Sequence, residues 1–303
     1  MINITAKSST HRIAVAQAIV RVSSVETISA IIEKRVSKGD VFEMSKAAGL
    51  FAAKRTSDMI PDCHPLPIEY ASITSQINGF DIVIRVEIQT IYKTGVEVEA
   101  MHAASVVALT MYDMLKPIDK NISIEQIKLV EKKGGKSDFA KKEISGIKAA
   151  VIVCSDSISK GTKQDSAGKA IIEKLKFSKI EIADYIIIPD EMSSIREKVK
   201  YYCSQQLQLV ILTGGTGLSP RDITPESLEG LIEKRIPGIE EVIRNYGQQR
   251  TPYSMLSRSV AGLIGNTLVL GLPGSTKGAA ESMEAIFPQI LHIFRVMKGA
   301  RHD

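Results

Sequence analysis

A polar segment in the middle of the chain separates two halves whose apolar residues follow different patterns. Residues 131–146 read EKKGGKSDFAKKEISG, a charged, glycine-bearing stretch almost without apolar side chains. Such a stretch has little to bury and is typical of a link between domains. The chain has 303 residues, more than the ~100–200 of one typical domain. We therefore predict two domains, at residues 1–140 and 147–303.

The first half mixes strands and helices. Asn78-Gly79 marks a hairpin turn between two runs of alternating apolar residues. Such runs predict four strands, over residues 13–22, 72–76, 80–92 and 124–130. Apolar periodicity, ended by Pro61 and Pro117, predicts helices over residues 25–34, 44–60 and 98–115. We predict an α+β, ferredoxin-like domain.

In the second half, short apolar runs alternate with helical stretches. The runs cover residues 149–154, 185–188, 209–212 and 267–270. Continuous apolar strands separated by helices are typical of a largely parallel sheet with helices on both faces. We predict an α/β, doubly wound domain.

Composition and charge argue against several functions. The three cysteines, at positions 63, 154 and 203, are too widely spaced to suggest a disulfide scaffold or a structural zinc site. No apolar run approaches the ~20 residues that span a membrane, and the first residues show no signal peptide. The net charge of +5 forms no basic stripe, and tryptophan is absent. We expect a cytoplasmic protein with no nucleic-acid or membrane partner.

The helix predicted at the end of the first half carries two notable polar residues. Asp113 and Lys116 lie on one face, where a surface ion pair is the ordinary explanation. The rest of the helix is rich in alanine and valine, so we expect it to be largely buried, and a buried acid or amine needs a partner or a function. Glu99 lies roughly 21 Å before Asp113 along this helix, too far to act on the same atom. Either the substrate is long or a neighbouring subunit completes the pocket.

Five motifs run through the first half in order: KGDVF (38–42), AAKRTSDMIPDCHPL (52–66), KTGVEVEA (93–100), AASVVALTMYDMLK (103–116) and GGKS (134–137). In these motifs the first half resembles cyclic pyranopterin monophosphate synthase, the MoaC family. The resemblance implies a lyase that converts 3′,8-cyclo-7,8-dihydro-GTP into cyclic pyranopterin monophosphate with loss of pyrophosphate.

The resemblance also implies roles for individual residues. Asp113 and Lys116 would be the general acid and base, assisted by Lys38, because opening and rebuilding a ring needs proton transfers. The substrate-binding positions would be Lys54, Asp62, Cys63, His64, Val98, Glu99 and Lys136. Asp62 departs from the family, which often has an apolar residue there.

The second half contains a glycine-rich turn directly after a buried strand. Residues 210–227 read VILTGGTGLSPRDITPES, so the strand ends at Gly214 and Thr224-Pro225 opens a helix. Backbone amides at the carboxyl end of a parallel strand, beside a helix N-terminus, predict an anion site. The turn matches neither the P-loop nor the dinucleotide-binding pattern.

Three aspartates strengthen the prediction of a nucleotide site. Asp156 follows the first strand of this half, Asp165 lies in a polar loop, and Asp222 follows the glycine turn. Loops at the carboxyl edge of a parallel sheet meet, and carboxylates beside phosphates suggest Mg²⁺. Helix caps and turn residues are the ordinary alternative for these positions.

Six motifs give the second half its own resemblance: SDS (155–157), DSAG (165–168), TGGTGLSPRDITPE (213–226), PG (237–238), SMLSRSVAG (254–262) and LPGSTK (272–277). Through them it resembles the MogA/MoaB family, in which the phosphate of molybdopterin attacks the α-phosphorus of ATP. The resemblance implies no tightly bound cofactor, but Mg²⁺ that arrives with ATP and is organised by Asp165 and Asp222, with Asp222 catalytic.

The molybdopterin- and ATP-binding residues implied by this second resemblance are Asp156, Asp165, Ser166, Gly214, Gly215, Thr216, Gly217, Arg221, Pro273, Gly274 and Ser275. A non-catalytic molybdopterin-binding or oligomerisation scaffold is the alternative for this half. The two families together imply small-molecule substrates (the cyclised GTP intermediate, molybdopterin and ATP) and a homo-oligomer, either a trimer or a hexamer.

Overall fold

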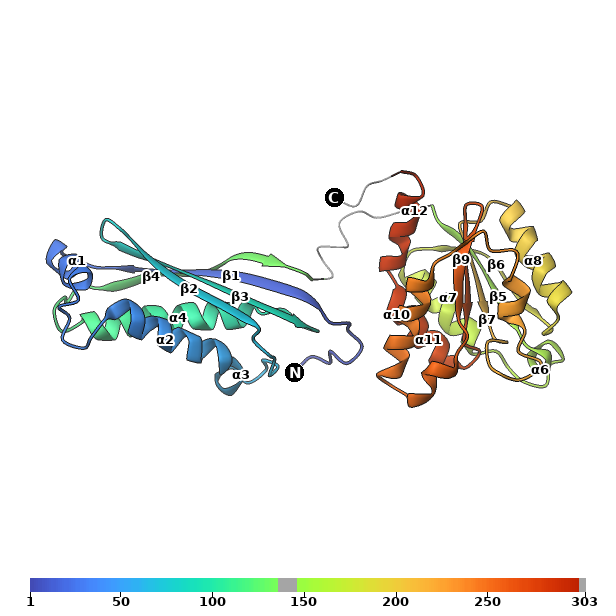
Figure 1. Cartoon of the computed structure of the whole chain (residues 1–303), viewed down its shortest axis with the longest axis horizontal. Helices are drawn as coiled ribbons and strands as arrows, with labels where there is room; N and C mark the ends of the chain where they lie inside the picture. Colours follow the sequence, from blue (N-terminus) through green and yellow to red (C-terminus); the bar gives the residue numbers. More distant parts are fainter. Residues whose placement is uncertain (136–145, 300–303) are drawn as a thin grey trace. The chain divides into compact units, whose positions relative to one another are not determined.

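The computed structural model describes residues 1–135 and 146–299, and the chain folds as two compact units, Met1–Lys141 and Lys142–Asp303 (Figure 1). Lys136, one of the expected substrate-binding residues, lies outside the described residues. Neither described stretch contains a helix that is both long and apolar enough to cross a membrane.

The first unit is a four-stranded antiparallel sheet with helices packed against it (Figure 1). Its strands are β1 (Thr10–Arg21), β2 (Tyr70–Asn78), β3 (Asp81–Tyr92) and β4 (Ser123–Lys133), in the order β2-β3-β1-β4. Its helices are α1 (Val25–Ile32), α2 (Val41–Lys54), α3 (Thr56–Met59) and α4 (Glu97–Leu115). Helix α4 packs on β1, whose small side chains at alternate positions, Ala14, Ala16 and Ala18, allow close approach.

Two boundaries in this unit differ from the sequence-based expectation. The helix predicted over residues 44–60 is two helices, because α2 ends at Lys54 and α3 begins at Thr56. Strand β4 continues to Lys133, inside the segment predicted as a link, because Lys133 still pairs with Ile13 of β1. Backbone pairing needs no apolar side chains, so composition alone placed the end of this strand too early.

The second unit is a doubly wound α/β domain, as predicted. Its strands are β5 (Lys148–Cys154), β6 (Glu181–Ile188), β7 (Leu209–Thr213), β8 (Lys234–Arg235), β9 (Val260–Ile264) and β10 (Thr267–Leu272). The sheet order is β6-β5-β7-β10-β9-β8; the first four strands are parallel, and β9 and β8 are antiparallel additions at one edge that the sequence did not suggest.

Helices cover both faces of this sheet. One face packs against α7 (Ala167–Phe177), α10 (Pro237–Gln248) and α11 (Thr276–Ile286). The other packs against α8 (Met192–Ser204) and α9 (Thr224–Leu228). The remaining short helical segments are α6 (Asp156–Ser159), η1 (Pro252–Leu256), η2 (Gln289–His292) and α12 (Ile293–Val296). The carboxyl ends of β6, β5, β7 and β10 therefore open onto one edge, where the predicted site residues lie.

Candidate functional site

The first unit holds Asp113 between two lysine side chains. Asp113 Oδ2 lies 2.6 Å from Lys38 Nζ, and Asp113 Oδ1 lies 2.8 Å from Lys116 Nζ. Lys38 also donates to the backbone oxygen of Asp113 at 2.8 Å. Gly39, with φ +107°, turns the chain between Lys38 and Asp40, which caps α2 by accepting hydrogen bonds from its first-turn amides. The turn thus places Lys38 over the last turn of α4.

This cluster is exposed, which corrects the expectation of a buried pair. The side chains of Lys38, Asp113 and Lys116 are 39–53% exposed, because α4 turns Met111 and Leu115 toward the sheet instead. Hydrogen bonds from the two lysines lower the pKa of Asp113 to about 2, and Asp113 raises the pKa of Lys116. At neutral pH the cluster therefore holds a carboxylate and an ammonium that can donate a proton.

A second cluster lies at the other end of α4. Glu99 is only 2% exposed, and its Oε1 accepts a hydrogen bond from Cys63 Sγ at 3.1 Å. Its Oε2 is buried and has no hydrogen-bond partner among the described residues. Burial raises the pKa of Glu99, and burial together with Glu99 raises the pKa of Cys63 to about 12. A buried acid with one free oxygen is suited to hold a ligand.

The other expected residues of this half that the structure describes are more exposed than Glu99. His64 Nε2 lies 2.8 Å from the backbone oxygen of Ile2, and the largely exposed Asp62 lies 2.9 Å from the amino group of Met1. Lys54, the last residue of α2, is exposed, and Val98 is 43% exposed. No hydrogen bond or ion pair within residues 1–135 joins the Glu99 cluster to Asp113.

Replacing Glu99 by glutamine is expected to stabilise the first unit at neutral pH. Because its pKa is raised from 4.5 in the folded state, the carboxyl favours folding when protonated, and stability falls as the pH rises above that ordinary value. Glutamine has nearly the same size as glutamate but carries no titratable group. The unfolding temperature of the Glu99→Gln variant should therefore exceed that of the wild type by about 2–4 °C. Calorimetry against pH checks this; equal pH slopes in the two proteins would contradict it.

In the second unit, the glycine-rich loop after β7 presents a row of backbone amides. Four successive carbonyl oxygens of this loop each accept a hydrogen bond. Gly214 O accepts from Thr224 Oγ1, and Gly215 O accepts from Thr224 N. Thr216 O accepts from Arg258 N, and Gly217 O accepts from Arg258 Nε. In a trans peptide the N–H points opposite to the C=O. The four following amides, of residues 215–218, make no hydrogen bond within the described part of the protein. Such a row of amides binds anions.

Close packing explains the glycines around this row. Gly214 has φ +106°, and a Cβ there would lie 2.1 Å from the backbone oxygen of Cys154 at the end of β5. A Cβ on Gly274, which follows β10, would lie 2.9 Å from the Cα of Gly214. Pro273 O accepts a hydrogen bond from Thr213 Oγ1 at 2.7 Å. Three strand ends therefore meet here, as predicted for the carboxyl edge. The following helix α9 has only five residues, so the row of amides, and not the helix, is the candidate anion site.

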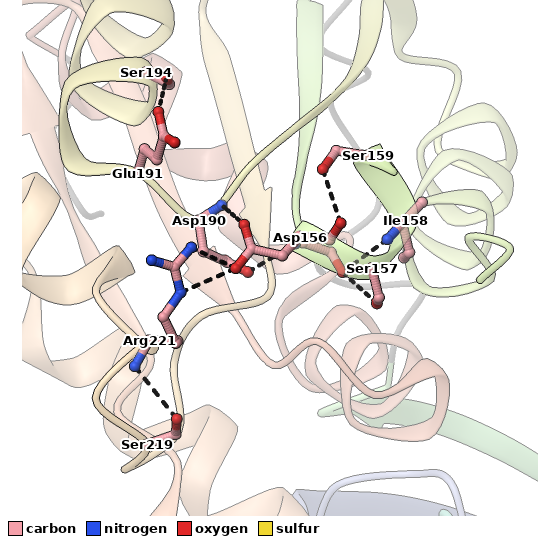
Figure 2. A network of polar contacts seen from close by, with 10 residues as sticks. Asp156, Ser157, Ile158, Ser159, Asp190, Glu191, Ser194, Ser219 and Arg221 are labelled. Carbon is pink, nitrogen blue, oxygen red and sulfur yellow. Dashed lines mark hydrogen bonds and ion pairs between the residues drawn. The ribbon is translucent and has the colours of Figure 1, made fainter. Parts of the chain in front are cut away.

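Figure 2 shows a polar network beside this loop. Asp156 N donates to Asp190 Oδ2 at 3.1 Å, and Asp190 N donates to Asp156 Oδ1 at 3.2 Å. Arg221 Nε donates to Asp156 Oδ2 at 2.9 Å, and this pairing lowers the pKa of Asp156. The structure thus brings together Asp156 and Arg221, two of the residues expected to bind molybdopterin or ATP, and pairs them with each other. An arginine held near the amide row adds positive charge to the same edge.

Asp190 is the residue that the sequence-based prediction missed. Its Oδ1 is buried without a hydrogen-bond partner in the described residues, and a Cβ on Gly215 would lie 3.2 Å from that oxygen. Burial raises the pKa of Asp190, and the charges of Asp156 and Asp222 raise it further. The signal was present: Asp190 follows the strand predicted over residues 185–188, just as Asp156 follows the preceding one.

Asp165 has a different environment from the one expected. Its carboxylate accepts hydrogen bonds from the amides of Gly168 and Lys169 at the start of α7, at 3.0 and 3.2 Å, and from Tyr185 Oη at 2.6 Å. These contacts engage both oxygens and place Asp165 as a cap at the start of α7, and no described contact joins it to Asp222. Ser166, the next residue, bonds to Thr276 beside the Pro273–Ser275 loop.

Asp222 lies against the glycine loop. Its Oδ2 accepts a hydrogen bond from Ser219 N at 2.8 Å, and a Cβ on Gly217 would lie 2.8 Å from the same oxygen. Within the described residues no group of three or more acidic, histidine or cysteine side chains could hold a metal ion alone. Mg²⁺ usually keeps several waters, and substrate phosphates fill further positions of its coordination shell. The carboxylates of Asp190 and Asp222 therefore suffice as protein ligands for Mg²⁺ that arrives with a nucleotide.

The fold and the two clusters define a two-domain protein with an acid–amine cluster on one unit and a row of free backbone amides on the other. Residues 1–135 match the MoaC family, and residues 150–292 match the family described as "Probable molybdopterin binding domain". A "Molybdenum cofactor biosynthesis bifunctional protein" from Chlorobaculum tepidum is 39% identical over 302 residues, 100% of this chain and 96% of the relative. The chain belongs to this family of bifunctional molybdenum cofactor biosynthesis proteins.

Each half also has relatives of its own. A cyclic pyranopterin monophosphate synthase from Thermomicrobium roseum is 42% identical over 145 residues, 47% of this chain and 87% of the relative. Among solved structures, the molybdopterin biosynthesis enzyme MoaB from Thermus thermophilus is 38% identical and covers 52% of this chain and 100% of its own, with a TM-score of 0.49.

Proposed function

We propose that the first unit converts the cyclised GTP intermediate into cyclic pyranopterin monophosphate and pyrophosphate. The cluster of Lys38, Asp113 and Lys116 carries this proposal, together with the similarity to synthases of that name. Lys116, held as an ammonium, would donate protons, while Asp113 orients it and Lys38. The sheet order β2-β3-β1-β4 and the β–α–β–β–α–β element order support the ferredoxin-like description of this unit.

We also propose that two copies of the first unit build each site together. The Glu99 and Asp113 clusters lie at opposite ends of α4, a separation of roughly 21 Å. Between them α4 exposes Leu109 at 58% and Tyr112 at 38%, and β4 exposes Leu129 at 37%. A twofold-related copy covering this apolar surface would bring the Glu99 end of one α4 toward the Asp113 end of the other. A hexamer of the whole chain would combine this twofold contact with a separate threefold contact, whereas a trimer would contain only the threefold contact.

Subunit mixing tests the shared site. Glu99→Gln and Lys116→Ala chains should each lack synthase activity, but mixed dimers would contain one intact site out of two. After unfolding and refolding together, the mixture should recover about a quarter of wild-type activity if copies pair at random. Refolded single variants are the controls. No recovery in a mixture shown to contain mixed dimers would mean that each copy holds a complete site.

For the second unit we infer transfer of the adenylyl group of ATP to molybdopterin. The row of four free amides beside the unpaired oxygen of Asp190 carries this inference. A phosphate oxygen of molybdopterin would form a bond to the α-phosphorus of ATP, and the bond to pyrophosphate would break. Asp190 and Asp222 would hold Mg²⁺, which neutralises charge on the ATP phosphates. The amides would hold the molybdopterin phosphate.

A non-catalytic molybdopterin-binding scaffold remains the competing function for this unit. An unpaired buried carboxylate is costly and serves no purpose in a scaffold, which favours the enzyme. ATP-dependent formation of adenylylated molybdopterin by the purified chain tests the inference, and tight binding without product would support the scaffold.

A further inference from the structure

Arg258 lies where the segment after η1 crosses the glycine-rich loop, within a motif to which the resemblance assigned no role. Its backbone N donates to Thr216 O at 3.0 Å, and its Nε donates to Gly217 O at 2.8 Å. Its Nη2 donates to Asp222 O at 2.6 Å. One residue therefore contacts the loop near its beginning and at its end.

These contacts set the direction of three amides. Because C=O and N–H point in opposite directions across a trans peptide, holding the carbonyls of residues 216, 217 and 222 turns the N–H groups of Gly217, Leu218 and Ile223 away from Arg258. None of these three amides makes a hydrogen bond within residues 1–135 and 146–299. Amides that point away from Arg258 and have no hydrogen-bond partner among the described residues are available to an anion.

The guanidinium is fixed on its remaining side. Arg258 Nη1 pairs with Glu226 Oε1 on α9, and the pairing lowers the pKa of Glu226, which keeps that carboxylate charged. A planar guanidinium donates in several fixed directions, whereas the single ammonium of lysine cannot reach acceptors on three sides at once.

We propose that Arg258 is a positioning residue for the anion site, aligning the amides of Gly217, Leu218 and Ile223 toward the phosphate that binds there. The identity of that phosphate as the one on molybdopterin rests on the proposed function, whereas the alignment of the amides does not. Arg258 itself faces the back of the loop and acts through the backbone.

Arg258→Lys in the full chain tests this proposal, with Arg196→Lys as the matched control. Arg196 donates to the backbone oxygens of Ser227, Glu226 and Glu229 at 3.0–3.2 Å, so it clamps α9 in the same manner but at the end away from the loop. Titration with inorganic phosphate is the first measurement. Both variants keep the first unit unchanged, so a difference between them reports on the second unit.

The affinity of Arg258→Lys for phosphate should fall about tenfold, and its KM for molybdopterin should rise about 10–10²-fold with a smaller change in kcat. Arg196→Lys should match the wild type in both. Wild-type phosphate affinity in Arg258→Lys, or equal losses in the two variants, would overturn the proposal. Weaker phosphate binding in Arg258→Lys alone, together with a wild type that makes no adenylylated product, would refute the proposed activity and leave this inference standing.

Discussion

Replacing Lys116 by alanine is expected to abolish formation of cyclic pyranopterin monophosphate. Lys116 is the ammonium that Asp113 holds at 2.8 Å, and alanine removes both the proton donor and one of the two cations beside Asp113. Proton transfer by a positioned group is worth ~10²–10⁴ in rate, so the synthase rate should fall by that factor. Adenylylation by the second unit of the same chain should be unchanged, which makes it an internal control for the amount of intact chain.

Lys34→Ala is the matched control for Lys116→Ala. Lys34 forms an exposed pair with Asp40 at 2.9 Å in the same unit, so its loss tests the effect of removing any surface ion pair. Such pairs contribute ~0–1 kcal/mol to stability, and the Lys34 variant should keep its synthase rate. Synthase turnover within about tenfold of wild type in Lys116→Ala would rule out the acid–base role.

Replacing Asp190 by asparagine is expected to stop adenylyl transfer while leaving molybdopterin binding largely intact. The amide can still accept the hydrogen bond from Asp156 N, so the loop should keep its shape. What disappears is the negative charge at the unpaired oxygen, where Mg²⁺ and the ATP phosphates would be held. Loss of a preorganised charge at a transfer site costs about 10²–10³ in kcat.

The stability of Asp190→Asn separates this role from a structural one. Burial raises the pKa of Asp190, so the ionised form opposes folding above the ordinary pKa, and the neutral amide should not lower the unfolding temperature. Asp184→Asn is the control: Asp184 lies on β6, the strand that precedes Asp190, but accepts hydrogen bonds from Tyr202 Oη and Tyr185 N. The Asp184→Asn variant should be less stable than the wild type and should keep its adenylyl-transfer activity. Normal adenylylation in Asp190→Asn would remove Asp190 from the site.

Local signals in the sequence were sufficient for much of the fold. Asn78-Gly79 gave the β2–β3 hairpin because the turn needs a residue such as Gly79 with positive φ, and continuous apolar runs gave the four parallel strands of the second unit. The edge strand β8 and its neighbour β9 were missed, because β8 has only two residues and Gly262 interrupts the apolar run of β9.

Contacts between the candidate site residues could be anticipated where they follow from spacing along the chain, and could not where they depend on packing. Asp113 and Lys116 share a helix face, so their pairing could be anticipated from spacing. Asp165 and Asp190 both occupy loops at one sheet edge, and only the three-dimensional contacts show that one caps a helix while the other keeps a free oxygen. Arg258 acts through carbonyl groups of a loop far from it in sequence, which no spacing reveals.

Product analysis of the purified chain tests the account most directly. The chain is incubated with the cyclised GTP intermediate and, separately, with molybdopterin and Mg-ATP, and products are identified by mass spectrometry. The expected result is cyclic pyranopterin monophosphate with pyrophosphate in the first reaction and adenylylated molybdopterin with pyrophosphate in the second. Unchanged substrate in either reaction, from a chain that binds that substrate, would contradict a chain with two catalytic units.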